Sequence, residues 1–154
     1  YFIKKGCKRI AFIGGTKRLF VTQDRLTGYE SALKQHQLPI DTNLTYFATE
    51  FLEEKGYQFS ELLFNHDPQI DAIITIDSLL AEGVCDYIAK HKLDVPVLSF
   101  VSVNPRLYLV AYVDINSLER GRVSFETILQ IINDAKNNKQ ICYRQLIGHK
   151  IIEK

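Results

Sequence analysis

Short runs of β-branched and apolar residues alternate with amphipathic segments along the first hundred residues. The first run, residues 8–13 (KRIAFI), is followed by Gly14 and Gly15 and then by a stretch with apolar residues at helical spacing. The pattern recurs at intervals of roughly 25 to 35 residues, which is typical of βαβ units. Because a strand that follows such a crossover runs parallel to its predecessor, the alternation predicts a mostly parallel sheet with helices on both faces.

The remaining elements are expected from the same periodicities. Helices are expected over 22–37, 53–64 and 78–91, and strands over 43–49, 71–76 and 95–100. After residue 100 a loop containing Asn104 and Pro105 leads to a strand over 109–113, a long helix over 116–136 and a last strand over about 141–151. The last part of the chain therefore departs from the pattern of one helix per crossover.

Composition excludes several classes of function. Lys plus Arg number 19 and Asp plus Glu number 18, so the formal net charge of +1 offers no basic excess to attract a nucleic-acid backbone. No stretch approaches the roughly 18 to 20 apolar residues of a membrane span, and the first residues lack the apolar run of a signal peptide. We therefore expect a cytoplasmic protein. The sequence contains no Met, so we also expect that it was either processed or cut from a longer polypeptide, of which the second is the favoured interpretation.

No arrangement of residues indicates a metal, a cofactor or an enzyme. The three Cys residues never stand in CxxC spacing, none of the four His residues has a spacing such as HxxxH, and no GxSxG motif occurs. The GGTK sequence after the first strand matches neither GxGxxG nor GxxxxGK, which favours a tight turn over a phosphate loop. Asp77 at a strand end lacks the acidic pair with which a phospho-accepting domain holds Mg²⁺.

A binding site is the better interpretation of the strand ends. Ligands of open parallel sheets gather outside the carboxyl ends of the strands, where Arg25, Phe51 and Asp77 are expected. A guanidinium fork, an aromatic face and a carboxylate together suit a small polyhydroxylated ligand. Each residue also has a purely structural alternative: a surface ion pair for Arg25, a place in the core for Phe51 and a helix N-cap for Asp77.

Four stretches, taken together and in this order, resemble the effector-binding core of the LacI-type (lactose and galactose repressor) family of bacterial transcription regulators. They are GCKRIAFIGG (6–15), DRLTGYESAL (24–33), DAIITIDSLLAEGV (71–84) and VPVLSFVSVNP (95–105). The resemblance runs from Lys4 to about Lys139. It implies an α/β fold, a periplasmic-binding-protein-like type I lobe with a doubly wound, mostly parallel sheet.

The resemblance also implies a division of the chain. Residues 1–108 correspond to the C-terminal effector-binding lobe, 109–139 to a strand and helix that pass into the N-terminal lobe, and 140–154 to a strand that returns. The DNA-binding headpiece is absent from the sequence. The implied partners are therefore a small effector such as a sugar, a second copy of the chain, and DNA only through that headpiece.

Site residues follow from the matched motifs. Arg25 matches the arginine that clamps the effector, and Phe51, in ATEFLEEKGY, matches an aromatic that packs on it. Asp77 and Ser78 stand in inverted order relative to the family's usual pair. Val101 occupies the position of an acidic effector ligand and cannot accept a hydroxyl, which leaves Ser102 and Asn104 as the substitutes.

The implied function is that of the effector-binding (sensor) and dimerisation fragment of a bacterial DNA-binding transcriptional regulator that responds to a sugar. In the family the helix after Asp77 contributes to the subunit contact, which points to Leu79, Glu82 and Val84 here. The alternative is a solute-binding receptor of a sugar transport system, which shares the fold and the motifs but carries an export signal.

Overall fold

A single sheet organises the chain. The computed structural model describes residues 1–101, 109–139, 141–143 and 145–153. Within them, six strands follow the order β2-β1-β3-β4-β5-β6. The strands are β1 (Ile10–Gly14), β2 (Thr45–Phe47), β3 (Ala72–Thr75), β4 (Val97–Val101), β5 (Ala111–Asp114) and β6 (Lys150–Glu153). All neighbouring pairs are parallel except β5 and β6, which confirms the predicted mostly parallel sheet.

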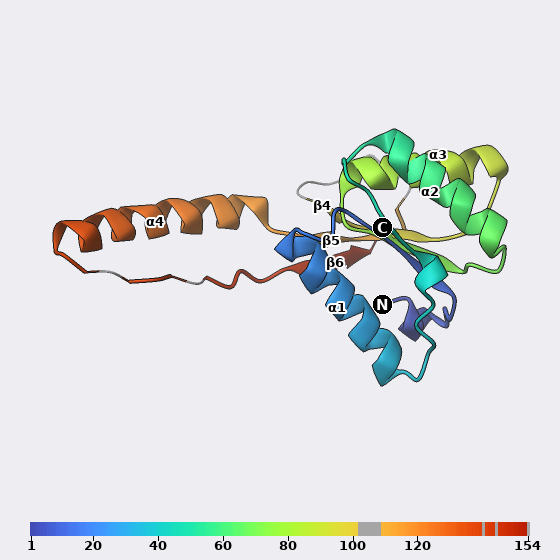
Figure 1. Cartoon of the computed structure of the whole chain (residues 1–154), viewed down its shortest axis with the longest axis horizontal. Helices are drawn as coiled ribbons and strands as arrows, with labels where there is room; N and C mark the ends of the chain where they lie inside the picture. Colours follow the sequence, from blue (N-terminus) through green and yellow to red (C-terminus); the bar gives the residue numbers. More distant parts are fainter. Residues whose placement is uncertain (102–108, 140, 144, 154) are drawn as a thin grey trace.

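Helices cover both faces of this sheet, as predicted. Figure 1 shows α1 (Phe20–Gln35) on one face, together with the short 3-10 turn η1 (Ile3–Lys5), and α2 (Glu53–His66) with α3 (Ser78–His91) on the other. A second 3-10 turn, η2 (Thr42–Leu44), leads into β2. The core lies between these layers: every residue of β1 is buried, which explains why its sequence reads as a continuous apolar run rather than an alternating one.

The two helices on the second face approach each other so closely that only glycine fits at the crossing. A Cβ added to Gly83 would lie 1.8 Å from the carbonyl oxygen of Glu53, and one added to Gly56 would lie 2.1 Å from that of Leu80. The backbones of α2 and α3 are therefore in direct contact. This contact fixes the start of α3, and with it the turn that joins β3 to α3.

The end of the chain differs from the expected boundaries. The strand expected over 109–113 corresponds to β5, which pairs with β4 on one side and β6 on the other and so lies in the same sheet as β1 to β4. The last strand is shorter than the expected 141–151: only Lys150–Glu153 has a neighbouring strand to pair with. Residues 141–143 instead run beside the preceding helix, where the Tyr143 hydroxyl donates to Asp134.

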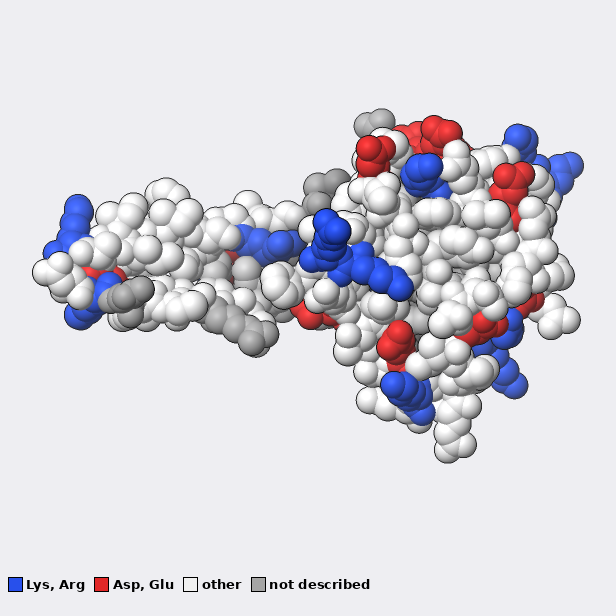
Figure 2. Space-filling view, viewed as in Figure 1, with Lys and Arg blue, Asp and Glu red and all other residues white. Residues whose placement is uncertain are grey.

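That helix, α4 (Ser117–Lys136), projects from the lobe as an arm (Figure 1). Its surface carries large apolar side chains that are about half-exposed or more in the described part of the chain, among them Phe125 at 63% exposure; the others are Leu118, Ile128, Leu129, Ile131 and Ile132. Figure 2 accordingly shows much of the arm without charged side chains. No helix in the described part of the chain is both long and apolar enough to cross a membrane.

We predict that Gly83→Ala destabilises the lobe, because the added methyl group collides with backbone that cannot rotate away. The expected loss is about 1 to 3 kcal/mol of unfolding free energy, measured by urea denaturation. Gly121→Ala in α4 is the matched control, since nothing lies within 4 Å of a Cβ at that position. An equal effect of the two substitutions would contradict the close crossing.

Candidate effector site

Arg25 reaches from the second turn of α1 to the end of β3. Its Nη1 donates to the carbonyl oxygen of Ile76 at 2.6 Å, and its guanidinium carbon lies 4.1 Å from the centroid of the Phe100 ring. Within the described residues no carboxylate lies within ion-pair distance, so the surface ion pair weighed from the sequence is wrong. Two contacts thus hold the guanidinium in place without consuming most of its donors.

The electrostatic surroundings of Arg25 are unusual for an arginine. Burial lowers the pKa of its guanidinium, the nearby charge of Arg120 acts in the same direction, and Asp77 opposes both. A half-buried cation without an anionic partner is costly unless other groups satisfy its donors. The site therefore favours a ligand that accepts hydrogen bonds.

Asp77 caps α3, as its structural alternative predicted. Its Oδ1 accepts from the backbone N–H groups of Leu79 (2.8 Å) and Leu80 (3.5 Å). Its carbonyl oxygen accepts from the hydroxyls of Ser99 (3.0 Å) and Thr75 (3.3 Å), both buried, which anchors the turn between β3 and α3. Both capping bonds use Oδ1, so the second carboxylate oxygen remains an acceptor for a ligand.

Phe51 lies against the glycine turn that follows β1. A Cβ on Gly15 would come within 2.6 Å of two atoms of its ring and within 3.4 Å of the Ile76 side chain. Only glycine therefore allows the ring this close, and the ring packs on the turn while the residue stays partly exposed. Arg25, Phe51 and Asp77 thus meet around Ile76, where the ends of β1 and β3 lie side by side.

The other predicted site residues have different outcomes. Ser78 is the first residue of α3 and is partly exposed beside Asp77. Ser102 and Asn104 lie outside the described residues. Val101 is 3% exposed and pairs in register with Asp114 of β5, whose Oδ1 accepts from the N–H of Asn116 at 2.8 Å. A carboxylate thus stands one strand away from the buried valine.

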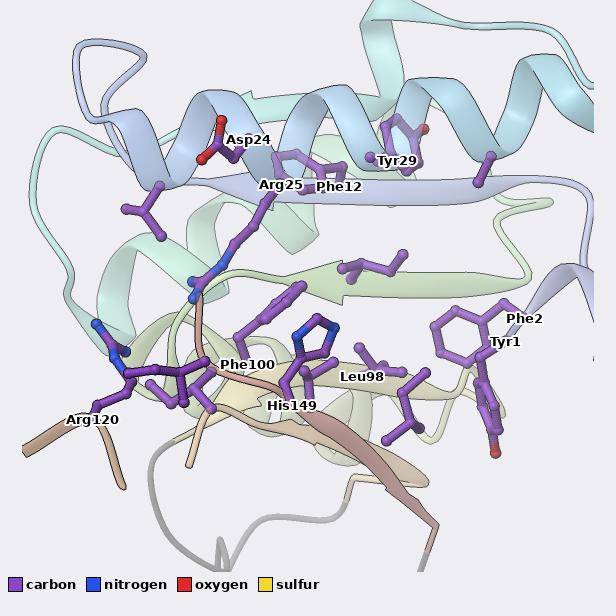
Figure 3. A pocket seen from close by; sticks show the side chains of 18 of the residues that line it. Tyr1, Phe2, Phe12, Asp24, Arg25, Tyr29, Leu98, Phe100, Arg120 and His149 are labelled. Atoms are coloured by element: carbon purple, nitrogen blue, oxygen red, sulfur yellow. The ribbon is translucent and has the colours of Figure 1, made fainter. Parts of the chain in front are cut away.

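A trough runs along the α1 side of the sheet, with Arg25 at one end. It encloses about 780 Å³ and is lined by α1, by strand residues that include Leu98 and Val113, and by the segment that enters β6. Figure 3 shows Arg25 extending from α1 towards Phe100, with Arg120 and His149 nearby, while Tyr1 and Phe2 lie at the opposite end. We refer to it below as the α1-side trough.

Sequence reasoning missed Phe100 and Arg120 as neighbours of Arg25. Phe100 lies in a strand, and its face could have been deduced from the alternation that places Leu98 and Phe100 on the same side. No signal in the sequence places Arg120 near Arg25, because that approach depends on where the chain leaves β5.

The three residues expected at a subunit contact do not share one surface. Leu79 is 40% exposed and Glu82 is partly exposed, whereas Val84 is fully buried. Val84 is corrected accordingly: it lies in the hydrophobic core and presents no surface to a partner. A hydrogen bond with Glu53, followed by burial, raises the pKa of the Glu82 carboxyl.

The arrangement suits binding better than catalysis. It combines guanidinium donors, a free carboxylate oxygen and an aromatic face around one strand end. No group of three metal-binding side chains occurs in the described part of the chain.

Comparison with known proteins identifies the domain. A family model described as a periplasmic binding protein-like domain matches residues 1–147. Over 154 residues the chain is 82% identical to the HTH-type transcriptional regulator MalR of Streptococcus pneumoniae, a match that covers 100% of this chain and 47% of that protein. Catabolite control protein A of Staphylococcus xylosus is 27% identical over 134 residues, which is 87% of this chain and 37% of that protein.

Solved structures agree with this assignment. A LacI transcriptional regulator from Bacillus cereus subsp. cytotoxis has a TM-score of 0.87 at 30% identity and covers 100% of this chain and 56% of its own. The complex of the transcriptional regulator CelR with cellobiose has a TM-score of 0.86 at 20% identity and covers 98% of this chain and 47% of its own. The chain spans about half the length of the curated relatives named above. These relatives are regulators rather than enzymes, in agreement with the sequence analysis. The chain therefore belongs to the periplasmic binding protein-like domain family, in the form carried by LacI-type transcriptional regulators.

Proposed function

We propose that this domain binds a sugar or a related polar metabolite at the carboxyl ends of β1 and β3. The observation that carries the proposal is the guanidinium of Arg25, which is half-buried, held by Ile76 and Phe100, and without a carboxylate partner in the described chain. One of its five N–H groups is used by the protein. The remaining donors suit the hydroxyl oxygens of a sugar.

Phe51 and Asp77 complete the proposed site. A partly exposed aromatic ring offers an apolar face to the C–H groups of a sugar ring, and the second oxygen of Asp77 accepts from a hydroxyl. That CelR was solved with cellobiose is consistent with this ligand class. Ser78, Ser102 and Asn104 are the further polar groups that we expect near the ligand.

We further propose that the domain is the sensor of a DNA-binding regulator in the cytoplasm. The net charge of +1 gives this domain no excess of basic residues to attract the DNA backbone. DNA would therefore be bound by another part of the protein, which agrees with the description of MalR as an HTH-type regulator. No observation favours the alternative of a transport receptor, because the named relatives are regulators.

The arm supports a two-lobed arrangement. The apolar surface of α4 needs cover, and a second lobe of the same protein is the cover that we propose for it. Arg120 in the first turns of α4 lies near Arg25, so the ligand site adjoins the junction of the two lobes. A ligand with higher affinity for one arrangement of the lobes shifts their equilibrium and passes the signal on.

A second copy of the chain is the remaining proposed partner. The exposed surface of α3 around Leu79 and Glu82 would form the contact, with Val84 supporting it from the core. Glu82 weakens such a contact because it already faces Glu53, and a twofold axis would bring further acidic groups close.

The first prediction concerns the ligand. In the full-length protein, a panel of mono- and disaccharides, sugar acids and nucleobases should contain a compound that raises the thermal unfolding temperature, because a ligand of the folded state stabilises it. Arg25→Ala should cost about 1.5 to 3 kcal/mol of binding free energy and abolish most of the shift, because hydrogen bonds to a charged group are lost.

Lys34→Ala, on the exposed side of α1, is the control and should keep the full shift. A compound that stabilises the Arg25→Ala protein as well as the unchanged one would place the ligand elsewhere.

The second prediction concerns dimerisation. In sedimentation experiments on the full-length protein, Leu79→Lys should weaken self-association by at least about tenfold, since it introduces a charge into an apolar contact. Glu82→Gln should strengthen self-association because it removes a carboxylate that faces other acids. Ser31→Lys on α1 should change nothing, and equal effects of all three would argue against the α3 contact.

A further inference from the structure

The turn between β5 and α4 fixes the position of Arg120. The N–H of Ile115 donates to the carbonyl oxygen of Val101 at 3.1 Å, so the pairing of β5 with β4 continues to the end of both strands. The Asp114 carboxylate accepts from the N–H of Asn116 at 2.8 Å, and Asn116 has a left-handed φ of +52°. The N–H of Arg120 donates to the carbonyl oxygen of Asn116 at 3.0 Å, which begins the hydrogen bonding of α4. Arg120 is therefore held about one helical turn beyond the end of β5.

Arg120 has no carboxylate partner among the described residues, in contrast to Arg122 on the same helix. Arg122 pairs with Glu119 and Glu126, each at 2.5 Å. No acidic residue stands three or four positions from Arg120, where side chains of one helix face meet. The acids of α4 closest to Arg120 in the sequence thus serve Arg122. The guanidinium of Arg120 is exposed and keeps its donors available.

The side chains of Arg25 and Arg120 lie at the same end of the α1-side trough. Both line it, and Figure 3 shows them at the end opposite to Tyr1 and Phe2. Burial lowers the pKa of the Arg25 guanidinium, and the positive charge of Arg120 lowers it further, so the two cations repel each other. Two such groups without a carboxylate between them are stabilised by any group that brings oxygen acceptors to both.

We infer that Arg120 is a second ligand-binding residue, and that one ligand accepts hydrogen bonds from the guanidinium groups of Arg25 and Arg120 together. The inference rests on the proposed function, because it concerns the same site. The shared chemistry is a set of oxygen acceptors, supplied by the hydroxyls of a sugar or by an acidic group carried on it. These oxygens satisfy both sets of donors and offset the repulsion between the two cations.

The two arginines also give the ligand a means of moving the arm, because Arg25 belongs to the lobe and Arg120 to α4. Without ligand, repulsion favours arrangements in which the arm keeps Arg120 away from Arg25. A ligand that bridges them binds more tightly to the arrangement in which they are close. This difference in affinity is what a shift between two arrangements requires. Arg120 therefore determines specificity and links ligand binding to the position of the arm.

The first test measures ligand affinity in the full-length protein. The neutral probes are glucose, lactose, maltose and cellobiose, and the charged probes are glucose 6-phosphate and glucuronate. Arg120→Leu should weaken the binding of the tightest probe by at least about tenfold, because hydrogen bonds from a charged group are lost. Arg122→Leu removes the same charge two positions away and should change the affinity by less than about twofold. A charged tightest probe assigns the acceptors to an acidic group, and a neutral one assigns them to hydroxyls.

The combination of both substitutions tests whether the two residues act on one ligand. In the Arg25→Ala, Arg120→Leu protein, the loss of affinity should be smaller than the product of the two single losses, since the residues are coupled through the ligand. A structural role of Arg120 would change the unfolding temperature of the free protein and leave the affinity unchanged. Unchanged affinity in Arg120→Leu, with binding still abolished by Arg25→Ala, overturns the inference and leaves the proposed function standing.

The second test needs no sugar, because inorganic phosphate reports whether the two guanidinium groups converge. Sodium phosphate should raise the unfolding temperature of the full-length protein more than sodium chloride of the same ionic strength does. Part of this rise is the general effect of phosphate on folded proteins and should persist in every variant. The excess should disappear in both Arg25→Ala and Arg120→Leu and remain in Arg122→Leu. An equal rise in all four proteins overturns the inference, whereas the expected pattern without any bound sugar supports it and contradicts the proposed sugar ligand.

Discussion

A parallel sheet imposes two requirements, and the rest of the structure follows from them. Both of its faces must be covered, and the carboxyl ends of its strands all meet at one edge. The first requirement explains the continuous apolar sequence of β1 and the direct contact of α2 with α3 on one face. The second requirement brings Arg25, Phe51 and Asp77 together around Ile76, although they are far apart in the sequence.

The structural roles of the site residues are compatible with the binding roles that we propose for them. Asp77 caps α3 with one carboxylate oxygen and keeps the other available, while its carbonyl is fixed by two buried hydroxyls. The ring of Phe51 rests on the glycine turn and so has a fixed orientation. Arg25 is held by a carbonyl and a ring. Groups held in this way lose little freedom when a ligand binds, which favours affinity.

The sequence predicts the elements well where local signals are strong. The helix expected over 78–91 matches α3 residue for residue, because Asp77 supplies an N-cap and the apolar spacing is regular. The strand expected over 141–151 shrinks to Lys150–Glu153, because strand formation requires a neighbour and the sequence does not show where β5 ends. The resemblance points to Val84 at a subunit contact, and periodicity alone does not tell that this side of α3 is buried. The contact of Arg25 with Phe100 and the trough depend on the packing of distant segments, which no local pattern encodes.

The most direct test of the central claim is hydrogen–deuterium exchange on the full-length protein, with and without a sugar that binds. The account predicts slower exchange in the backbone that follows β1, in the segment around Phe51 and in the turn from Ile76 to Leu80, where the strand ends meet. Slower exchange confined to the α1-side trough, or to the exposed side of α2 and α3, would contradict a ligand site at the carboxyl edge of the sheet.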